Sequence, residues 1–434
     1  MRELFQELLQ RLEQGETVAM ATVVKRKGSV PREVGAKMLV LRGGKISGTV
    51  GGGCGEAEVW RSALNVIDTR RPSMVSVDLT EEIAMESEGV CGGIFDVFVQ
   101  PWFNADVSES EQPSMQDYAH AICEALQGEQ ACVLATVIAA GGAWRSAFGQ
   151  HMLIHENGTS LGNLALPNMA ANLKEQIVQS ARNAILAGKP HVETIGNAEG
   201  RKIKRGIVGP TLAVGLGNAV GLGNAVGLGN AVGLEGATGL ETDAWAEIFI
   251  EPFIPPPVLL IAGAGHIAAP LAALGSLMNF SVSVTDDRAS FANRERFPAA
   301  KQILVGDIEA ILRSYPITPR THIVLVTRAH AHDVHGLRAV IDSSAAYIGM
   351  IGSQRRVWAV FKLLHDEGVP AEKLARVRAP IGLDLGGSTP EEIALSIMSE
   401  IILLRHHGSG QPMSDALRSR FMERLRRLDE GEEE

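Results

Sequence analysis

The sequence has little cysteine, no excess of positive charge and no signal-peptide-like start, and each of these shortages excludes a class of protein. Its 434 residues include only 4 cysteines, which argues against a disulfide-stabilised secreted fold and favours reduced thiols. The formal net charge of −10 argues against general nucleic-acid binding, which requires a basic face. Residues 1–16 lack the apolar core of a signal peptide, so we expect a cytoplasmic protein.

One apolar run resembles a membrane-spanning segment but is interrupted. Residues 258–278 are long and apolar enough to imitate a transmembrane helix. Gly263, Gly265, His266 and Pro270 break the run, so a buried strand followed by a helix start explains it better. We therefore expect no association with a membrane.

Two stretches of the N-terminal half are similar to each other. Residues 21–48 and 135–162 align without a gap at an offset of 114. A helical run precedes each stretch, and a similar strand closes each one, at 95–101 and at 246–252. The residues of the first stretch that meet an identical residue in the second are Ala21, Thr22, Val23, Gly28, Gly35, Met38, Leu39, Gly44 and Gly48. We interpret the two stretches as copies of one α/β module.

The first copy contains two loops in which a cysteine lies among glycines. The loop "GGGCG" holds Gly51, Gly52, Gly53 and Cys54, and the loop "GVCGG" holds Cys91, Gly92 and Gly93. At the offset of 114 the second copy has Ala-Leu-Pro-Asn (165–168) in place of the first loop. In place of the second loop it has "AVGLGN" three times (213–230), which we interpret as a flexible glycine loop produced by replication slippage. Only the first copy therefore carries the function of these loops.

The chemistry of thiols suggests what such loops do. Cysteine binds metals and reacts as the thiolate, and nearby backbone N–H groups lower its pKa. Soft thiolates suit copper, zinc or molybdenum and can carry sulfur as a persulfide, but two cysteines are too few for a closed zinc site. The alternatives are glycine-rich turns that happen to hold small residues, and a thiol switch in which Cys54 pairs with Cys91. Cys123 and Cys132 lie in apolar contexts and are predicted to be core residues.

From residue 258 onward, apolar strand-like runs alternate with helical ones, which predicts a parallel, doubly wound sheet. The first strand leads into a G-x-G-x-x-A turn with Gly263, Gly265 and His266, and Asp286 ends the second strand. This context is typical of a dinucleotide site for NAD(P) or another nucleotide. Because the His266 ring would lie beside the phosphate position, a Rossmann fold whose ligand site has changed is the alternative.

Two further motifs follow later strands of this sheet. The segment "TRAHAHDVH" (327–335) contains a cluster of potential metal ligands or proton carriers, although such clusters on exposed loops often bind nothing. Ser353 is a predicted helix N-cap, and Arg355 with Arg356 can hold an anion beside it or remain solvated. The side chains of the first motif are His330, His332, Asp333 and His335.

Taken together, these motifs resemble the XdhC/CoxI family. "ATVVKRKGSVPREVGAKMLVL", "GTVGGGCGEAEV" and "VFVQP" are similar to its N-terminal domain. "LLIAGAGHIAAPLAALGSLMNFSVSVTDDR", "TRAHAHD" and "IGMIGSQRR" are similar to its C-terminal Rossmann domain. The long middle module with its "AVGLGN" expansion departs from the family pattern, which affects the choice of partner more than the basic chemistry.

The resemblance implies a maturation factor for molybdenum hydroxylases such as xanthine dehydrogenase. Such a protein binds the molybdenum cofactor, as molybdopterin or its dinucleotide form, supports its sulfuration and inserts it into the apo-enzyme. The partners implied are that apo-enzyme, a sulfur donor of the cysteine desulfurase type and a second copy in a homodimer. We expect a cofactor chaperone rather than an enzyme, and the alternative is an NAD(P)-dependent oxidoreductase that uses the Rossmann domain.

Carried over to this chain, the resemblance assigns the binding residues. Cys54 and Cys91 are the expected molybdenum contacts, supported by Gly51–Gly53 and Gly92–Gly93. The expected nucleotide-binding residues are Gly263, Gly265, His266, Asp286, Arg288, Ser353 and Arg355.

The expected organisation follows from the boundaries of these segments. The fold class is α/β, with a duplicated N-terminal α/β module followed by a C-terminal Rossmann-like, doubly wound parallel sheet. The segments are the first copy (1–104), a linker (105–117), the degenerate second copy (118–254), the Rossmann-like domain (258–408), and an amphipathic helix with an acidic tail (409–434).

Overall fold

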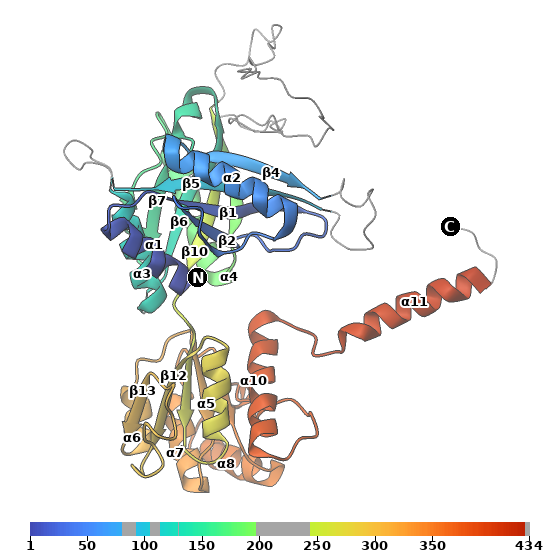
Figure 1. Cartoon of the computed structure of the whole chain (residues 1–434). Helices are drawn as coiled ribbons and strands as arrows, with labels where there is room; N and C mark the ends of the chain where they lie inside the picture. The colour runs from blue at the N-terminus through green and yellow to red at the C-terminus, as the bar shows by residue number, and fades with distance from the viewer. Residues whose placement is uncertain (80–92, 105–112, 129, 197–243, 430–434) are drawn as a thin grey trace, which may run out of the picture. The chain divides into compact units, whose positions relative to one another are not determined.

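A computed structural model describes residues 1–79, 93–104, 113–128, 130–196 and 244–429 (Figure 1). The chain divides into two compact units, Met1–Pro255 and Pro256–Glu434. Cys91, Gly92, the "AVGLGN" repeat and the acidic tail lie outside the described residues.

The first copy is an antiparallel five-stranded sheet with one helix on its outer face. The strand order is β3-β2-β1-β5-β4. Apolar side chains of α2 (Val59, Ala63, Val66) pack on the strands in one buried cluster. The elements are α1 (Arg2–Glu13), β1 (Val18–Lys27), β2 (Lys37–Leu41), β3 (Ile46–Gly48), α2 (Gly53–Thr69), β4 (Ser73–Asp78) and β5 (Ile94–Trp102).

The second copy repeats this arrangement. Its sheet has the corresponding order β8-β7-β6-β10-β9, and α4 covers it through Leu173, Ile177 and Ala181. The elements are α3 (Met115–Gln127), β6 (Cys132–Gly141), the 3₁₀ helix η2 (Gly142–Ala147), β7 (His151–His155), β8 (Ser160–Gly162), α4 (Ala171–Ala187), β9 (His191–Gly196) and β10 (Trp245–Phe253). The duplication expected from the sequence is confirmed.

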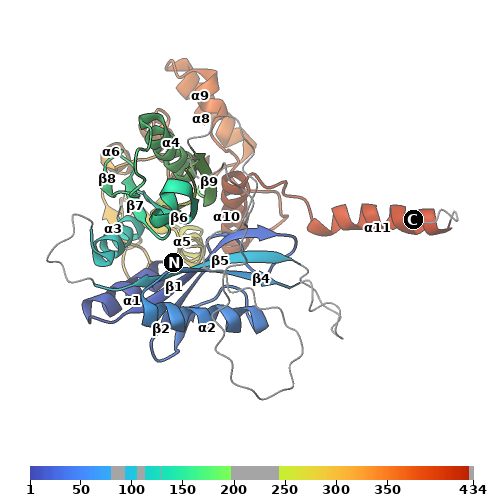
Figure 2. The same ribbon diagram turned by 90° about the horizontal axis from the view of Figure 1, so that it is seen from above.

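The faces of the two sheets that α2 and α4 leave open pack against each other. Val24 and Phe98 of the first copy share a buried cluster with Ile138 and Phe249 of the second. Beside this cluster, α1 and α3 lie side by side in both views (Figures 1 and 2). Phe5 of α1 packs edge-on to the rings of Trp102 and Phe253, one from each copy, in the buried cluster that also contains residues of α3. The N-terminal unit therefore has the layers helix, sheet, sheet, helix.

The C-terminal unit is a parallel five-stranded sheet in the order β13-β12-β11-β14-β15, as predicted. Helices α5 and α10 cover one face, and α6, α7 and α8 cover the other, so the sheet is doubly wound. The strands are β11 (Val258–Ala262), β12 (Ser281–Asp286), β13 (Gln302–Val305), β14 (Thr321–Leu325) and β15 (Tyr347–Met350). The helices are α5 (Ala268–Leu277), α6 (Ile308–Ser314), α7 (His330–Val340), α8 (Gln354–Asp366), α9 (Ala371–Ala375), α10 (Pro390–His406) and α11 (Met413–Asp429).

The apolar run 258–278 forms β11 and α5, as expected from its interruptions. Within the part of the chain that the structure describes, no helix has the length and apolar character needed to cross a membrane. The helix expected after residue 409 corresponds to α11, whose Leu417 and Phe421 are exposed.

Candidate functional site

The loop "GGGCG" connects β3 to α2 and forms the first turn of that helix. Gly52 is the N-cap with φ +90°, and Gly53 is the first helical residue with φ +67°. Both values lie in the left-handed region that L-residues with a side chain rarely adopt. Cys54 is the second residue of α2, so its backbone lies where helix amides have no intrahelical partner; its side chain is outside the described part.

The glycines of this loop and its surroundings have two different reasons to be glycine. A Cβ on Gly51 would lie 2.9 Å from Pro31 Cγ, and one on Gly55 would lie 2.6 Å from Val77 Cγ1. A Cβ on Gly93 would lie 2.6 Å from the carbonyl oxygen of Ser29. These three positions are glycine because of packing. Among the residues that the structure describes, none lies within 4 Å of a Cβ placed on Gly52 or Gly53, so packing does not require glycine there.

The loop takes its shape from Glu56, which the sequence analysis did not select. One carboxylate oxygen of Glu56 accepts hydrogen bonds from Val50 N–H (3.3 Å), Gly52 N–H (3.2 Å) and the Thr49 hydroxyl (2.5 Å). The carboxylate lies in the first turns of α2, where the positive end of the helix dipole favours it. A glutamate two residues after the cysteine was the available sequence signal.

The segment before α4 in the second copy contributes buried side chains. The Trp144 indole is fully buried and donates its Nε1–H to the Pro167 carbonyl (2.9 Å). Leu164 and Leu166 are buried in the same cluster. The start of α4 itself is exposed, as is the start of α2.

The residue equivalence expected for this loop needs a correction. Helix α2 begins at Gly53 and α4 at Ala171, an offset of 118, so the second copy has four more residues before its helix. The counterparts of Gly51–Cys54 in helix register are Met169–Asn172, and not 165–168 as the ungapped alignment indicated. Buried positions agree with the new register, since Val59 corresponds to Ile177 and Ala63 to Ala181.

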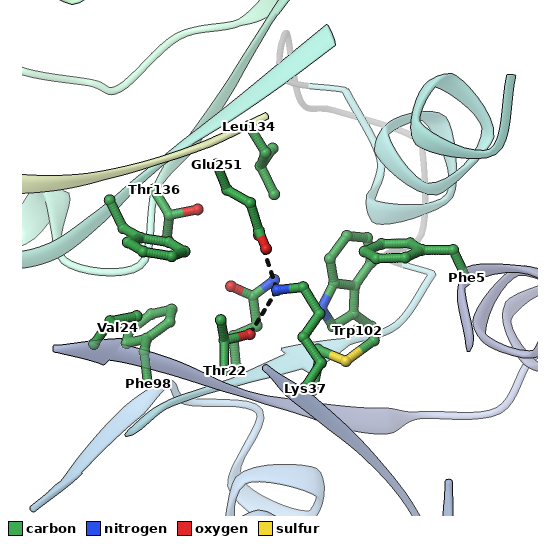
Figure 3. Close-up of a pocket in the computed structure, with 12 residues that line it drawn as sticks. Phe5, Thr22, Val24, Lys37, Phe98, Trp102, Leu134, Thr136 and Glu251 are labelled. Atoms are coloured by element: carbon green, nitrogen blue, oxygen red, sulfur yellow. Dashed lines mark hydrogen bonds and ion pairs between the residues drawn. The ribbon is translucent and has the colours of Figure 1, made fainter. Parts of the chain in front are cut away.

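A buried ion pair joins the two copies, and the sequence analysis missed it. The Lys37 ammonium lies 2.8 Å from Glu251 Oε2 and donates to Thr22 Oγ1 (2.8 Å) (Figure 3). Lys37 comes from β2 of the first copy and Glu251 from β10 of the second, and both side chains are almost completely buried. The available sequence signal was a polar residue at matching positions of the two copies, within strands that are otherwise mostly apolar.

The equivalent positions of the two copies differ in charge. Lys37 corresponds to His151, whose Nδ1 lies 3.1 Å from Thr136 Oγ1, just as Lys37 contacts Thr22. Burial lowers the pKa of His151 to about 4, so the ring is neutral. Burial raises the pKa of Glu251, and the Lys37 ammonium opposes that shift. The cavity beside this pair is about 10 Å³, roughly the size of one water, so it is no site for a cofactor.

In the C-terminal unit, the predicted glycine turn follows β11 directly. A Cβ on Gly263 (φ +106°) would lie 2.5 Å from the carbonyl oxygen of Val326 at the end of β14, so the close approach of these segments requires glycine. A Cβ on Gly265 would meet no described residue within 4 Å, and His266 is exposed in the turn before α5. The turn thus lies exposed at a helix N-terminus, the position at which dinucleotide phosphates bind in Rossmann folds.

Asp286 ends β12 and is buried against this turn. Its carboxylate accepts hydrogen bonds from Ala264 N–H (2.7 Å) and from the backbone and guanidinium of Arg288. Burial alone would raise the pKa of Asp286, but these hydrogen bonds hold it below its usual range. The neighbouring Asp287 is paired with Arg328 (2.7 Å) and lies 3.7 Å from Arg288.

Some residues of the later motifs have structural roles, and others are exposed to solvent. Ser353 caps α8, as predicted, by accepting from Arg356 N–H (3.3 Å), and Arg355 is exposed. Arg356 pairs instead with the fully buried Asp333, which also accepts from the Thr327 hydroxyl. Burial raises the pKa of Asp333, and its partners oppose that shift.

The histidine cluster lies on the first turns of α7 and not on a loop. His330 and His335 are exposed, and His335 lies 3.6 Å from Glu309. Among the residues that the structure describes, no three His, Cys, Asp or Glu side chains are arranged to hold a metal ion.

Comparison with known proteins gives matches in both units. The sequence model of the XdhC and CoxI family matches residues 11–78 and again residues 125–196, one match in each copy. The XdhC Rossmann domain matches residues 259–401.

Similar proteins come from several bacteria. A probable xanthine dehydrogenase subunit of Bacillus subtilis (strain 168) is 24% identical over 91% of this chain and 95% of its own length. YqeB of Escherichia coli (strain K12) is 30% identical over 36% of this chain, which spans only 28% of YqeB. The molybdenum cofactor insertion chaperone PaoD of the same organism is 25% identical over 24% of this chain and 32% of PaoD. A crystal structure of a xanthine dehydrogenase from Bacillus halodurans has the same fold, with a TM-score of 0.62 at 21% identity over 95% of this chain and 98% of that one.

Proposed function

This chain belongs to the XdhC and CoxI family, and from that premise we propose that it is a maturation factor for a molybdenum hydroxylase of the xanthine dehydrogenase type. Its first module binds the molybdenum cofactor, supports the sulfuration of that cofactor and holds it for insertion into the apo-enzyme. The name of PaoD, a molybdenum cofactor insertion chaperone, supports the same role.

One observation carries this proposal: α2 of the first copy begins at Gly52–Gly53 with positive φ, whereas α4 of the second begins at Ala170 with φ −64°. An exposed helix N-terminus suits a ligand with an anionic group, because its first backbone N–H groups have no intrahelical partner. The phosphate of a pterin cofactor is such a group. The second copy has no glycine and no cysteine at the matching positions 169–172, so we propose that one chain holds one cofactor.

Cys54 and Cys91 are the proposed molybdenum contacts. At the second position of α2, a Cys54 thiolate benefits from the helix dipole and the neighbouring amides. A thiolate is a soft ligand that suits molybdenum, and as a persulfide it can also relay sulfur from a cysteine desulfurase-type donor. Gly51, Gly92 and Gly93 complete this proposed site, with Gly51 and Gly93 keeping the loop close to its support.

The Rossmann domain is proposed to bind a nucleotide, either NAD(P) or the nucleotide part of the cofactor. The residues proposed for it are Gly263, Gly265, His266, Arg288, Ser353 and Arg355, with Asp286 holding the glycine turn through the Ala264 N–H. The apo-hydroxylase and the sulfur donor are the proposed partners, in the cytoplasm, and a homodimer is the proposed assembly.

The test is a matched pair of variants in the full-length protein. Cys54→Ala is expected to lose molybdenum and pterin, measured by elemental analysis and by pterin fluorescence after co-expression with the cofactor pathway. Asn172→Ala changes the same helix position in the second copy, where the side chain is exposed, and is expected to keep the full load. Equal loads in the two variants, both folded by circular dichroism, would contradict the role of Cys54.

A further inference from the structure

The carboxylate that binds the ribose hydroxyls in many Rossmann folds already accepts four hydrogen bonds from the protein in this one. Asp286 ends β12, the position from which an acidic residue commonly binds the ribose hydroxyls of NAD. An ionised carboxylate offers about four lone-pair sites to donors. In this chain, Oδ1 accepts from Arg288 N–H (3.0 Å) and Nε–H (2.8 Å), and Oδ2 accepts from Ala264 N–H (2.7 Å) and Arg288 Nη2–H (3.0 Å). Asp286 therefore braces the glycine turn and has no acceptor left for a hydroxyl group.

Donors, in contrast, remain available at the same edge of the sheet. A guanidinium carries five N–H donors. Among the described contacts, Arg288 uses two of them on Asp286, and Arg328 uses one on Asp287. Arg288 follows β12 and Arg328 follows β14, the strands on either side of β11, so the two cations flank the glycine turn.

The two arginines meet at Asp287. Its Oδ2 lies 2.7 Å from Arg328 Nη2, and its Oδ1 lies 3.7 Å from Arg288 Nε. The Asp287 side chain is one-third exposed, so it can leave this position without opening the core. A carboxylate held between two guanidinium groups marks a place that another anion can take.

We propose that this edge of the sheet binds a phosphate monoester between Arg288 and Arg328, in the place of the Asp287 carboxylate, and does not bind a free ribose diol. Phosphate oxygens accept charge-assisted hydrogen bonds from both arginines, which are about twice as strong as neutral ones. A ribose diol would have to compete with Arg328 for the Asp287 carboxylate, and the two arginines would gain no new hydrogen bond to an anion. The phosphate can belong to a 2′-phosphorylated dinucleotide or to a pterin.

The test compares NADP⁺ with NAD⁺, which differ only in the 2′-phosphate, by calorimetric titration of the full-length protein. We expect NADP⁺ to bind at least about tenfold more tightly, the ratio given by one hydrogen bond to a charged group. Arg328→Gln should remove that preference by weakening NADP⁺ alone. Arg313→Gln is the matched control, because Arg313 is also exposed and pairs with a carboxylate, Glu309 of α6, but should change neither affinity.

Each other outcome has a defined meaning. NAD⁺ binding as tightly as NADP⁺, or a loss of NAD⁺ binding in Asp287→Asn, would overturn the proposal because a carboxylate would then be reading the diol. If neither dinucleotide binds, the cofactor load of Arg328→Gln decides: a load below that of Arg313→Gln supports the pterin phosphate, and an equal load overturns the proposal. The titrations do not depend on Cys54, so failure of the proposed function and failure of this inference are distinguishable.

Discussion

The two N-terminal copies share a strand order, yet they begin the outer helix with different backbone conformations. In the first copy the N-cap of α2 is Gly52 with φ +90°, followed by Gly53 with φ +67°. In the second, four additional residues precede the helix, and the N-cap of α4 is Ala170 with φ −64°. The same sheet and helix therefore form with either kind of helix start. A glycine start in one copy alone agrees with a ligand that approaches that copy alone.

The copies differ again where they face each other. Matching strand positions hold Lys37 and Gln100 in the first copy and His151 and Glu251 in the second. Of these four, only Lys37 and Glu251 form an ion pair, so the contact between the sheets has a charged side and a neutral side. This asymmetry can be tested by changing one copy at a time.

Breaking the ion pair should have the largest effect. Lys37→Met leaves the Glu251 carboxylate buried without its partner, which costs about 3–5 kcal/mol in the free energy of unfolding. Adding Glu251→Gln should restore most of that loss. Urea denaturation is the measurement, and Arg42→Met, which breaks the exposed pair with Asp68, is the control expected to cost less than about 1 kcal/mol. A similar loss of unfolding free energy in Lys37→Met and in Arg42→Met would mean that burial does not strengthen the contribution of the Lys37–Glu251 pair.

The neutral side of the contact, at His151, should make the stability of the folded protein depend on pH. His151 is buried with a pKa of about 4, whereas an unfolded chain protonates histidine near its ordinary value of about 6.5. The unfolded state therefore binds more protons between these values, so stability is full above about pH 6.5 and falls toward pH 4, by about 3 kcal/mol. His322 in the C-terminal unit, whose pKa is also lowered to about 4, adds its own dependence.

The variant His151→Gln isolates the contribution of the N-terminal unit. The difference in unfolding free energy between this variant and the unchanged chain should vary with pH only between about 4 and 6.5. A difference that is constant with pH would show that the pKa of His151 is the same in the folded and unfolded protein.

Introducing a side chain at the glycine turn should have the smallest effect on stability. Gly52→Ala forces alanine into a backbone conformation (φ +90°, ψ 174°) that is essentially restricted to glycine, which costs about 2 kcal/mol, although the new methyl group meets no described neighbour. The N-cap of α4 is Ala170 with φ −64°, so Ala170→Gly is the matched change in the second copy. It should change stability by less than about 1 kcal/mol, because glycine is preferred over alanine at an N-cap but adds freedom to the unfolded chain. Thermal unfolding measures both. A neutral Gly52→Ala would mean that this turn readily adopts another conformation.

Much of the fold could be predicted because its signals are local. Apolar β-branched runs separated by helical ones predicted the parallel sheet, and the Gly263 turn marked its first crossover. The duplication was visible because glycines at matching turns survive in both copies. The four-residue shift before α4 was missed because the ungapped alignment ended at Gly162, although "SALN" (62–65) and "SARN" (180–183) match at the offset of 118.

The features that sequence reasoning missed depend on contacts between distant parts of the chain. Lys37 and Glu251 belong to different copies and lie more than 200 residues apart in the sequence, so no local pattern suggests that they are partners. Asp286 was expected to face a ligand, and only the geometry of Arg288 and Ala264 reveals that its acceptors are occupied. A motif identifies which residue is present, but not which of its lone pairs are free.

The packing of sheet against sheet has a consequence for how such a protein can evolve. When two identical chains meet across such a face, every substitution appears on both sides of the symmetry axis at once. Joining the copies in one polypeptide removes that restriction, so a lysine can face a glutamate without a second lysine facing a second glutamate. The same freedom lets one half begin its outer helix with alanine while the other begins it with glycines. A duplicated module within one chain can therefore vary each half independently, which two identical chains cannot.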